Sequence, residues 1–135
     1  MWKKMFFWIV LILVFNIDSN AQSFSGTWGY QISGKEITLY GDKISNLNYG
    51  GHTGTLKVAL YATSFPYSGG TINGYKLYEI RLNSLDAGYS YNDISNTGYC
   101  SYPPSGYYYL TILLLEYNYS YEIVDYISLN GYEKF

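Results

Sequence analysis

The chain has 135 residues, with 8 Lys and Arg, 10 Asp and Glu, one His and one Cys, and a formal net charge of −2 at pH 7. This balance excludes the basic surface that nucleic acid binding requires. One cysteine cannot form an intramolecular disulfide, and one cysteine with one histidine cannot complete a zinc site. The length fits one domain.

A short leader is predicted at the amino terminus. Lys3 and Lys4 precede an apolar run of about 11 residues, and the small residues Ser19-Asn20-Ala21 follow. These are features of a secretory signal peptide, and the run is shorter than the roughly 20 residues that span a bilayer. We expect residues 1–21 to be removed, leaving a mature domain of residues 22–135. That domain would have no membrane span and would be secreted, periplasmic or at the cell surface. Retention of the leader as an anchor is the alternative.

Short strands are predicted along the rest of the chain. Tyrosine occurs 19 times and glycine 14 times, and these residues favour pleated surfaces and turns. Period-two alternation dominates, with no sustained helical spacing, and turn signals separate the segments. The expected strands are residues 27–32, 36–40, 43–47, 54–63, 75–82, 88–93, 106–117 and 121–129. This pattern is typical of an all-β antiparallel sandwich.

Two of these segments carry unusual side-chain patterns. Residues 106–117 are apolar on both faces, with Leu113 and Leu114 on opposite sides. A strand of this kind is either covered on both sides or faces a partner. In residues 121–129, Asp125 interrupts an apolar stripe, which favours an edge strand protected by a charge.

Three segments resemble a known family. Residues 55–64 (TLKVALYATS) are similar to a strand followed by a small polar turn, residues 82–90 (LNSLDAGYS) to a leucine–acid–glycine step, and residues 103–110 (PPSGYYYL) to a Pro-x-Gly-x-Tyr-Tyr strand entry. Together they resemble the CARDB-like bacterial cell-adhesion-related domain over residues 43–129. The resemblance implies an immunoglobulin-like β-sandwich of about 7–8 strands that adheres or binds and has no active site.

Candidate catalytic residues are scarce. His52 lies among glycines in a predicted loop, and Cys100 has no basic neighbour to lower the pKa of its thiol. We interpret Cys100 as a small buried residue, with intermolecular pairing as the alternative. Acidic residues show no calcium-binding spacing. We therefore expect no catalytic residue, no metal and no cofactor.

Aromatic residues beside predicted turns are the remaining candidates for binding. Tyr49 lies next to Gly50-Gly51, Tyr67 precedes Ser68-Gly69-Gly70, and Tyr75 follows Asn73-Gly74. Tyrosine offers a flat apolar face and a polar tip, which suits sugars and proteins. We expect these three tyrosines to contact a ligand or partner, and Phe65 to fill the end of the core.

The sequence therefore predicts an exported, non-catalytic binding or adhesion module that recognises a protein or a glycan at the cell surface. Two alternatives stay open at this point. One is a carbohydrate-binding module. The other is a self-assembling, homo-oligomeric subunit that pairs through its apolar strands.

Overall fold

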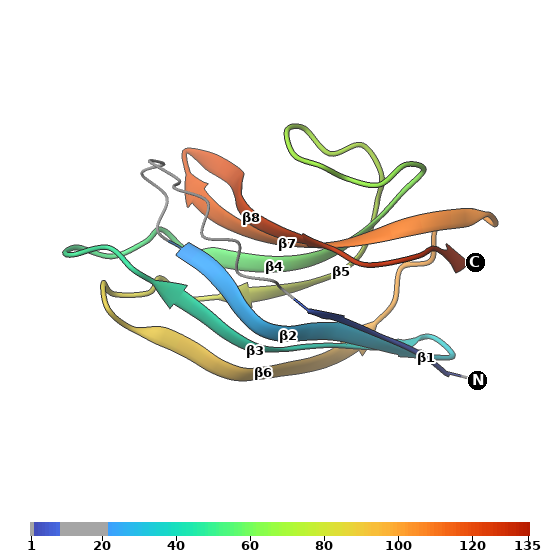
Figure 1. The fold of residues 1–135 in the computed structure, drawn as a ribbon, viewed down its shortest axis with the longest axis horizontal. Helices are drawn as coiled ribbons and strands as arrows, with labels where there is room; N and C mark the ends of the chain where they lie inside the picture. The colour runs from blue at the N-terminus through green and yellow to red at the C-terminus, as the bar shows by residue number, and fades with distance from the viewer. Residues whose placement is uncertain (1, 9–21) are drawn as a thin grey trace.

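A computed structural model describes residues 2–8 and 22–135, and every regular element in these ranges is a β-strand (Figure 1). The first sheet has the strand order β1-β2-β3-β6, and the second has the order β5-β4-β7-β8, with β9 paired to β7. All pairings are antiparallel. The strands are β1 (Trp2–Trp8), β2 (Gln22–Ser33), β3 (Glu36–Asn46), β4 (Leu56–Thr63), β5 (Tyr75–Leu82), β6 (Ser90–Tyr99), β7 (Tyr107–Asn118), β8 (Ser120–Ser128) and β9 (Glu133–Lys134). The all-β antiparallel sandwich expected from the sequence is confirmed.

The connections between the two sheets interlock. The chain crosses from β3 to β4, returns from β5 to β6, and crosses again from β6 to β7. As a result β6 pairs with β3 in one sheet, and β7 pairs with β4 in the other. The sheets stack face to face (Figure 1), with β2 in contact with β8 along one side and β5 with β6 along the other.

The core lies between the sheets and follows the alternation in the sequence. In β4, Leu56, Val58 and Leu60 face inward and are fully buried. Trp28 of β2 is also fully buried, and its ring lies so close to Gly41 of β3 that a Cβ on that glycine would be 1.9 Å from a ring atom. Only glycine fits opposite this ring.

The close approach explains one difference from the sequence-based prediction. Residues 36–40 and 43–47 were expected to be two strands separated by a turn at Gly41, but β3 runs through this glycine. Residues 96–98 likewise resemble a turn and lie inside β6, where Thr97 pairs with Thr38 of β3. The two threonine hydroxyls are 2.7 Å apart. In both places the pairing between strands overrides the local turn preference.

Two tyrosine hydrogen bonds fix parts of the sandwich that are distant in the strand order. Tyr108, at the start of β7, donates its hydroxyl proton to the carbonyl of Pro104 at 2.8 Å, which braces the crossing from β6 to β7. Tyr30 of β2 donates to Glu133 Oε1 of β9 at 2.6 Å. This second bond ties the carboxyl-terminal strand to the opposite sheet.

Residues 2–8 form strand β1 on the outer edge of β2. The sequence analysis placed these residues in a leader outside the domain, whereas in the full chain they pair with an edge that would otherwise be open. The expected cleavage site after Ala21 lies outside the described residues, so its use stays a prediction.

Candidate functional site

Strand β7 is covered on both faces. Leu113 and Leu114 are each fully buried, which confirms that the doubly apolar segment is a central, covered strand. Leu114 belongs to the core between the sheets. Leu113 lies on the outer face of the second sheet, in register with Ala59 of β4 and Tyr126 of β8.

The loop of residues 64–74 is fastened to this outer face (Figure 1). Ser128 of β8 donates its hydroxyl proton to the carbonyl of Tyr67 at 2.5 Å. The rings of Tyr67 and Tyr126 pack edge to face with centroids 4.8 Å apart, and the Tyr67 hydroxyl donates to the Gly70 carbonyl at 2.5 Å. Burial raises the pKa of Tyr67 above its usual value. The loop thus forms a fixed wall above the sheet.

A groove of about 800 Å³ lies beside this wall. Its lining combines loop residues with side chains of β4, β7 and β8, including the aromatic residues Tyr61, Tyr67, Tyr121 and Tyr126. The acids Glu122 and Asp125 of β8 also line it. The groove offers apolar ring surfaces beside hydrogen-bonding groups, a combination common in ligand sites.

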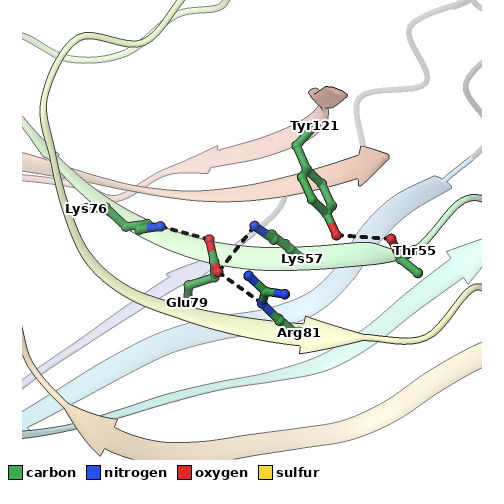
Figure 2. Close-up of polar contacts among 6 residues, drawn as sticks. All are labelled: Thr55, Lys57, Lys76, Glu79, Arg81 and Tyr121. Atoms are coloured by element: carbon green, nitrogen blue, oxygen red, sulfur yellow. Dashed lines mark hydrogen bonds and ion pairs between the residues drawn. The ribbon is translucent and has the colours of Figure 1, made fainter. Parts of the chain in front are cut away.

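A polar network extends across the same face, as Figure 2 shows. The ammonium of Lys57 lies 3.9 Å from the centroid of the Tyr121 ring, and the Tyr121 hydroxyl is 3.0 Å from Thr55 Oγ1. A cation over an aromatic face is attracted by the ring quadrupole. Together these contacts hold the Tyr121 ring in one orientation at the groove.

Glu79 of β5 anchors this network. Its carboxylate forms ion pairs with Lys76 at 3.0 Å, Lys57 at 3.4 Å and Arg81 at 3.6 Å. Burial opposes ionisation of Glu79, but the hydrogen bond from Lys76 and the charges of Lys76 and Lys57 outweigh it and lower the pKa of the carboxyl. Three cations surround one carboxylate, so this part of the sheet face has a local excess of positive charge.

Asp125 connects the groove to the first sheet. Its Oδ2 accepts the backbone N–H of Phe24 in β2 at 2.8 Å, and its Oδ1 accepts that of Tyr126 at 2.8 Å. Burial raises the pKa of this carboxyl, and the two backbone hydrogen bonds only partly offset the effect. The interruption of the apolar stripe is therefore an acid on an edge strand that also bridges the sheets.

The aromatic loop residues predicted to bind do not form one surface. Tyr49 is fully exposed on the loop between β3 and β4, at the opposite end of β4 from Tyr67 and Tyr75. Tyr75 is 48% exposed and packs against the ring of Tyr108. Tyr67 is only 8% exposed, although it lines the groove. Ligand contact by these three residues stays a prediction.

The assignment of Phe65 to the core was wrong. Phe65 is 80% exposed. The Thr63 hydroxyl donates to the Phe65 carbonyl at 2.6 Å, and the loop then returns over the outer face of the sheet instead of covering the end of the core. The aromatic side chain of this loop that is buried is Tyr67, two residues later, and it packs against Tyr126 on the outer face of the sheet.

The other candidates have simple surroundings. His52 is exposed, and its Nδ1 lies 2.8 Å from the carbonyl oxygen of Thr53. Cys100 is buried as predicted, and burial raises the pKa of its thiol to about 11.

Within the part of the chain that the structure describes, no group of three or more His, Cys, Asp or Glu side chains is arranged to hold a metal ion. Among residues 2–8 and 22–135, no helix has the length and hydropathy needed to cross a bilayer.

Sequence reasoning missed the residues that build the groove. Tyr61 occupies an outward position of β4, and Tyr121 and Tyr126 belong to β8. The alternation in β4 was a usable signal, because Lys57 and Tyr61 fall on the face opposite the core residues Leu56, Val58 and Leu60.

Comparisons with models of known protein families, with curated proteins and with solved structures found no match.

Proposed function

We propose that this chain is an exported, non-catalytic binding module that recognises a glycan at the cell surface through the tyrosine-lined groove. The observation that carries the proposal is the groove of about 800 Å³ in which the Tyr121 ring is held between Lys57 and Thr55. Sugar rings present apolar C–H faces and many hydroxyls, so they need flat aromatic surfaces next to donors and acceptors. Tyr61, Tyr121 and Tyr126 supply rings. Glu122 and Asp125 supply charged polar groups in the lining, and Lys57 lies against the Tyr121 ring.

We also propose an immunoglobulin-like fold. Two features support it: the interlocked pairing of β3 with β6 and of β4 with β7, and the bond from Tyr108 to the Pro104 carbonyl. A tyrosine at this corner, bonded to backbone a few residues upstream, is a hallmark of immunoglobulin-type sandwiches. The proposed kinship with CARDB-like adhesion domains rests on this fold and on the motifs in residues 55–64, 82–90 and 103–110.

A glycan array probed with the exported protein tests the proposal. A bound glycan is then titrated against Tyr121→Ala, which should weaken binding by about 1 kcal/mol or more, the size typical of an aromatic anchor. Tyr121→Phe keeps the ring and loses only the bond to Thr55, so it should weaken binding less. Tyr99→Ala, on β6 of the other sheet and 70% exposed, is the matched control. Equal affinities for the Tyr121→Ala and Tyr99→Ala variants would contradict the assignment of the groove.

A protein ligand is the second candidate. The rings of Tyr107 and Tyr132 pack edge to face 5.4 Å apart, and both side chains are 61% exposed. Exposed aromatic pairs are enriched at protein interfaces. An empty glycan array, followed by binding to a cell-surface protein that Tyr107→Ala abolishes, would favour this candidate.

A further inference from the structure

Strand β2 has a bulge between Ser25 and Trp28, and beyond it the outer edge carries neither the charges nor the prolines that normally protect a sheet edge. Edge strands usually carry charges or prolines that prevent pairing with another chain. Asp93 serves this role on β6, Arg81 on β5 and Glu122 on β8. The 12 residues of β2, QSFSGTWGYQIS, contain no charged residue and no proline.

This edge accepts an antiparallel strand in the full chain. Residues 2–8 pair with seven consecutive residues of β2, with Trp8 opposite Thr27 and Trp2 opposite Ser33. The middle of the paired segment is Tyr30, opposite Met5. The occupied length is therefore long enough for a regular ladder.

The strand that covers this edge belongs to the predicted leader. Removal of residues 1–21 on export would uncover those backbone groups of residues 27–33 that point toward β1, while the others stay bonded to β3. Exposed backbone donors and acceptors along seven residues form a template for another strand. This step rests on the export and cleavage that belong to the proposed function.

We propose that the exported protein forms a two-fold symmetric dimer in which β2 pairs with β2 of a second copy. The two-fold axis passes through Tyr30, so Thr27 lies opposite Ser33 of the partner, and Trp28 lies opposite Ile32 of the partner. The first sheets of the two copies become one continuous sheet of six strands, β6-β3-β2 from each copy.

The choice of a second copy follows from the self-complementarity of this edge. Antiparallel pairing about a two-fold axis brings the same patch of each copy together, so a charge on the patch would tend to face its own kind. β2 has none. Trp28, Tyr30 and Ile32 are buried on the core side of β2. In the dimer the cores of the two copies would therefore lie side by side under the joined sheet.

Charge placement provides a test of this register. Thr27 and Ser33 point away from the core, and Ser33 is exposed. The double variant Thr27→Lys/Ser33→Lys puts two lysines opposite each other at both ends of the paired segment. Thr27→Lys/Ser33→Glu puts a lysine opposite a glutamate instead. The control Ser95→Lys/Tyr99→Lys adds the same charge to β6.

Sedimentation equilibrium over a concentration series gives the dissociation constant of the dimer. The sample is exported protein whose mass shows that it begins at Gln22. We expect a dimer for the unsubstituted protein. The two-lysine β2 variant should dissociate about tenfold or more readily, since like charges opposite each other destabilise strand pairs. The lysine–glutamate variant and the β6 control should remain dimeric. Circular dichroism of each variant verifies that the sandwich is folded.

Three results would overturn the inference. A monomer at all concentrations refutes the dimer, and equal dissociation of the β2 and β6 lysine variants refutes the interface. Exported protein that keeps residues 1–21 refutes the open edge. Binding on the glycan array is measured separately, so failure of the dimer and failure of the glycan proposal can be told apart.

Discussion

The buried bond between Tyr30 and Glu133 gives the sharpest test of the packing. The Tyr30 side chain is fully buried, and its hydroxyl donates to the Glu133 carboxylate at 2.6 Å. A hydrogen bond to an ionised group contributes about 1.5–3 kcal/mol to stability. Tyr30→Phe removes this donor with almost no change in shape, so we expect the free energy of unfolding at pH 7 to fall by about 2 kcal/mol.

The same bond predicts a specific pH dependence. Burial raises the pKa of Tyr30 above its ordinary value of 10.0, and the bond to Glu133 and the charge of that residue raise it further. The unfolded chain therefore loses the Tyr30 proton above pH 10 while the folded chain retains it, so stability falls as pH rises. At pH 11 this linkage removes about 1.4 kcal/mol. The Tyr30→Phe variant does not have this loss.

Urea denaturation of both proteins at pH 7, 9, 10 and 11 measures the effect. The gap between wild type and Tyr30→Phe should be about 2 kcal/mol up to pH 9 and less than 1 kcal/mol at pH 11. Tyr67 and Tyr78 also have raised pKa values, but they are present in both proteins and cancel in the difference. Tyr40 and Cys100 are likewise present in both, and their charges are the smallest of the causes that raise the pKa of Tyr30. A gap that stays constant or widens at pH 11 would refute the reasoning.

Five further substitutions test the covering of the second sheet. Leu113→Ala and Leu114→Ala should each lower the free energy of unfolding by about 2–5 kcal/mol, because both side chains are fully buried; calorimetry showing either melting temperature unchanged would contradict this. Thr111 is fully buried and, among the described residues, its hydroxyl has no hydrogen-bond partner, so Thr111→Val should not lower stability and should raise it by about 1 kcal/mol. Tyr67→Ala should lower the melting temperature clearly, since the ring packs on the sheet, whereas Phe65→Ala should change it little; the reverse order would mean that the loop is held differently.

The sequence by itself determined the all-β class and the limits of several strands. β5 has the bounds expected from alternation, and β7 and β8 begin and end within one residue of their expected limits. Hydrophobic periodicity is a local property, so it identifies a strand and its apolar faces without knowledge of the partners. The apolar pattern of β7 left two possibilities, a covered strand or a strand that faces a partner, and the burial of Leu113 and Leu114 within this chain agrees with the first.

The groove could not be derived in this way. Its residues come from three strands and one loop that are distant in sequence, and they meet only because β4 pairs with β7 and β7 pairs with β8. Alternation assigns Tyr61 and Tyr121 to a face but does not say which side chains lie beside them there. That information depends on the pairing order, and the pairing order is a property of the whole chain.

Turns predicted from glycine and its neighbours were wrong where contacts with distant segments outweighed the local turn preference. Gly41 and Gly98 resemble turn residues, yet each lies inside a long strand, against the rings of Trp28 and Tyr78 respectively. Phe65 is exposed and does not fill the end of the core as expected, because the bond from Ser128 to Tyr67 and the ring contact with Tyr126 hold the loop over the outer face of the sheet. Local sequence determines where the backbone can bend, whereas packing against a distant segment decides whether it does and which aromatic side chain turns inward.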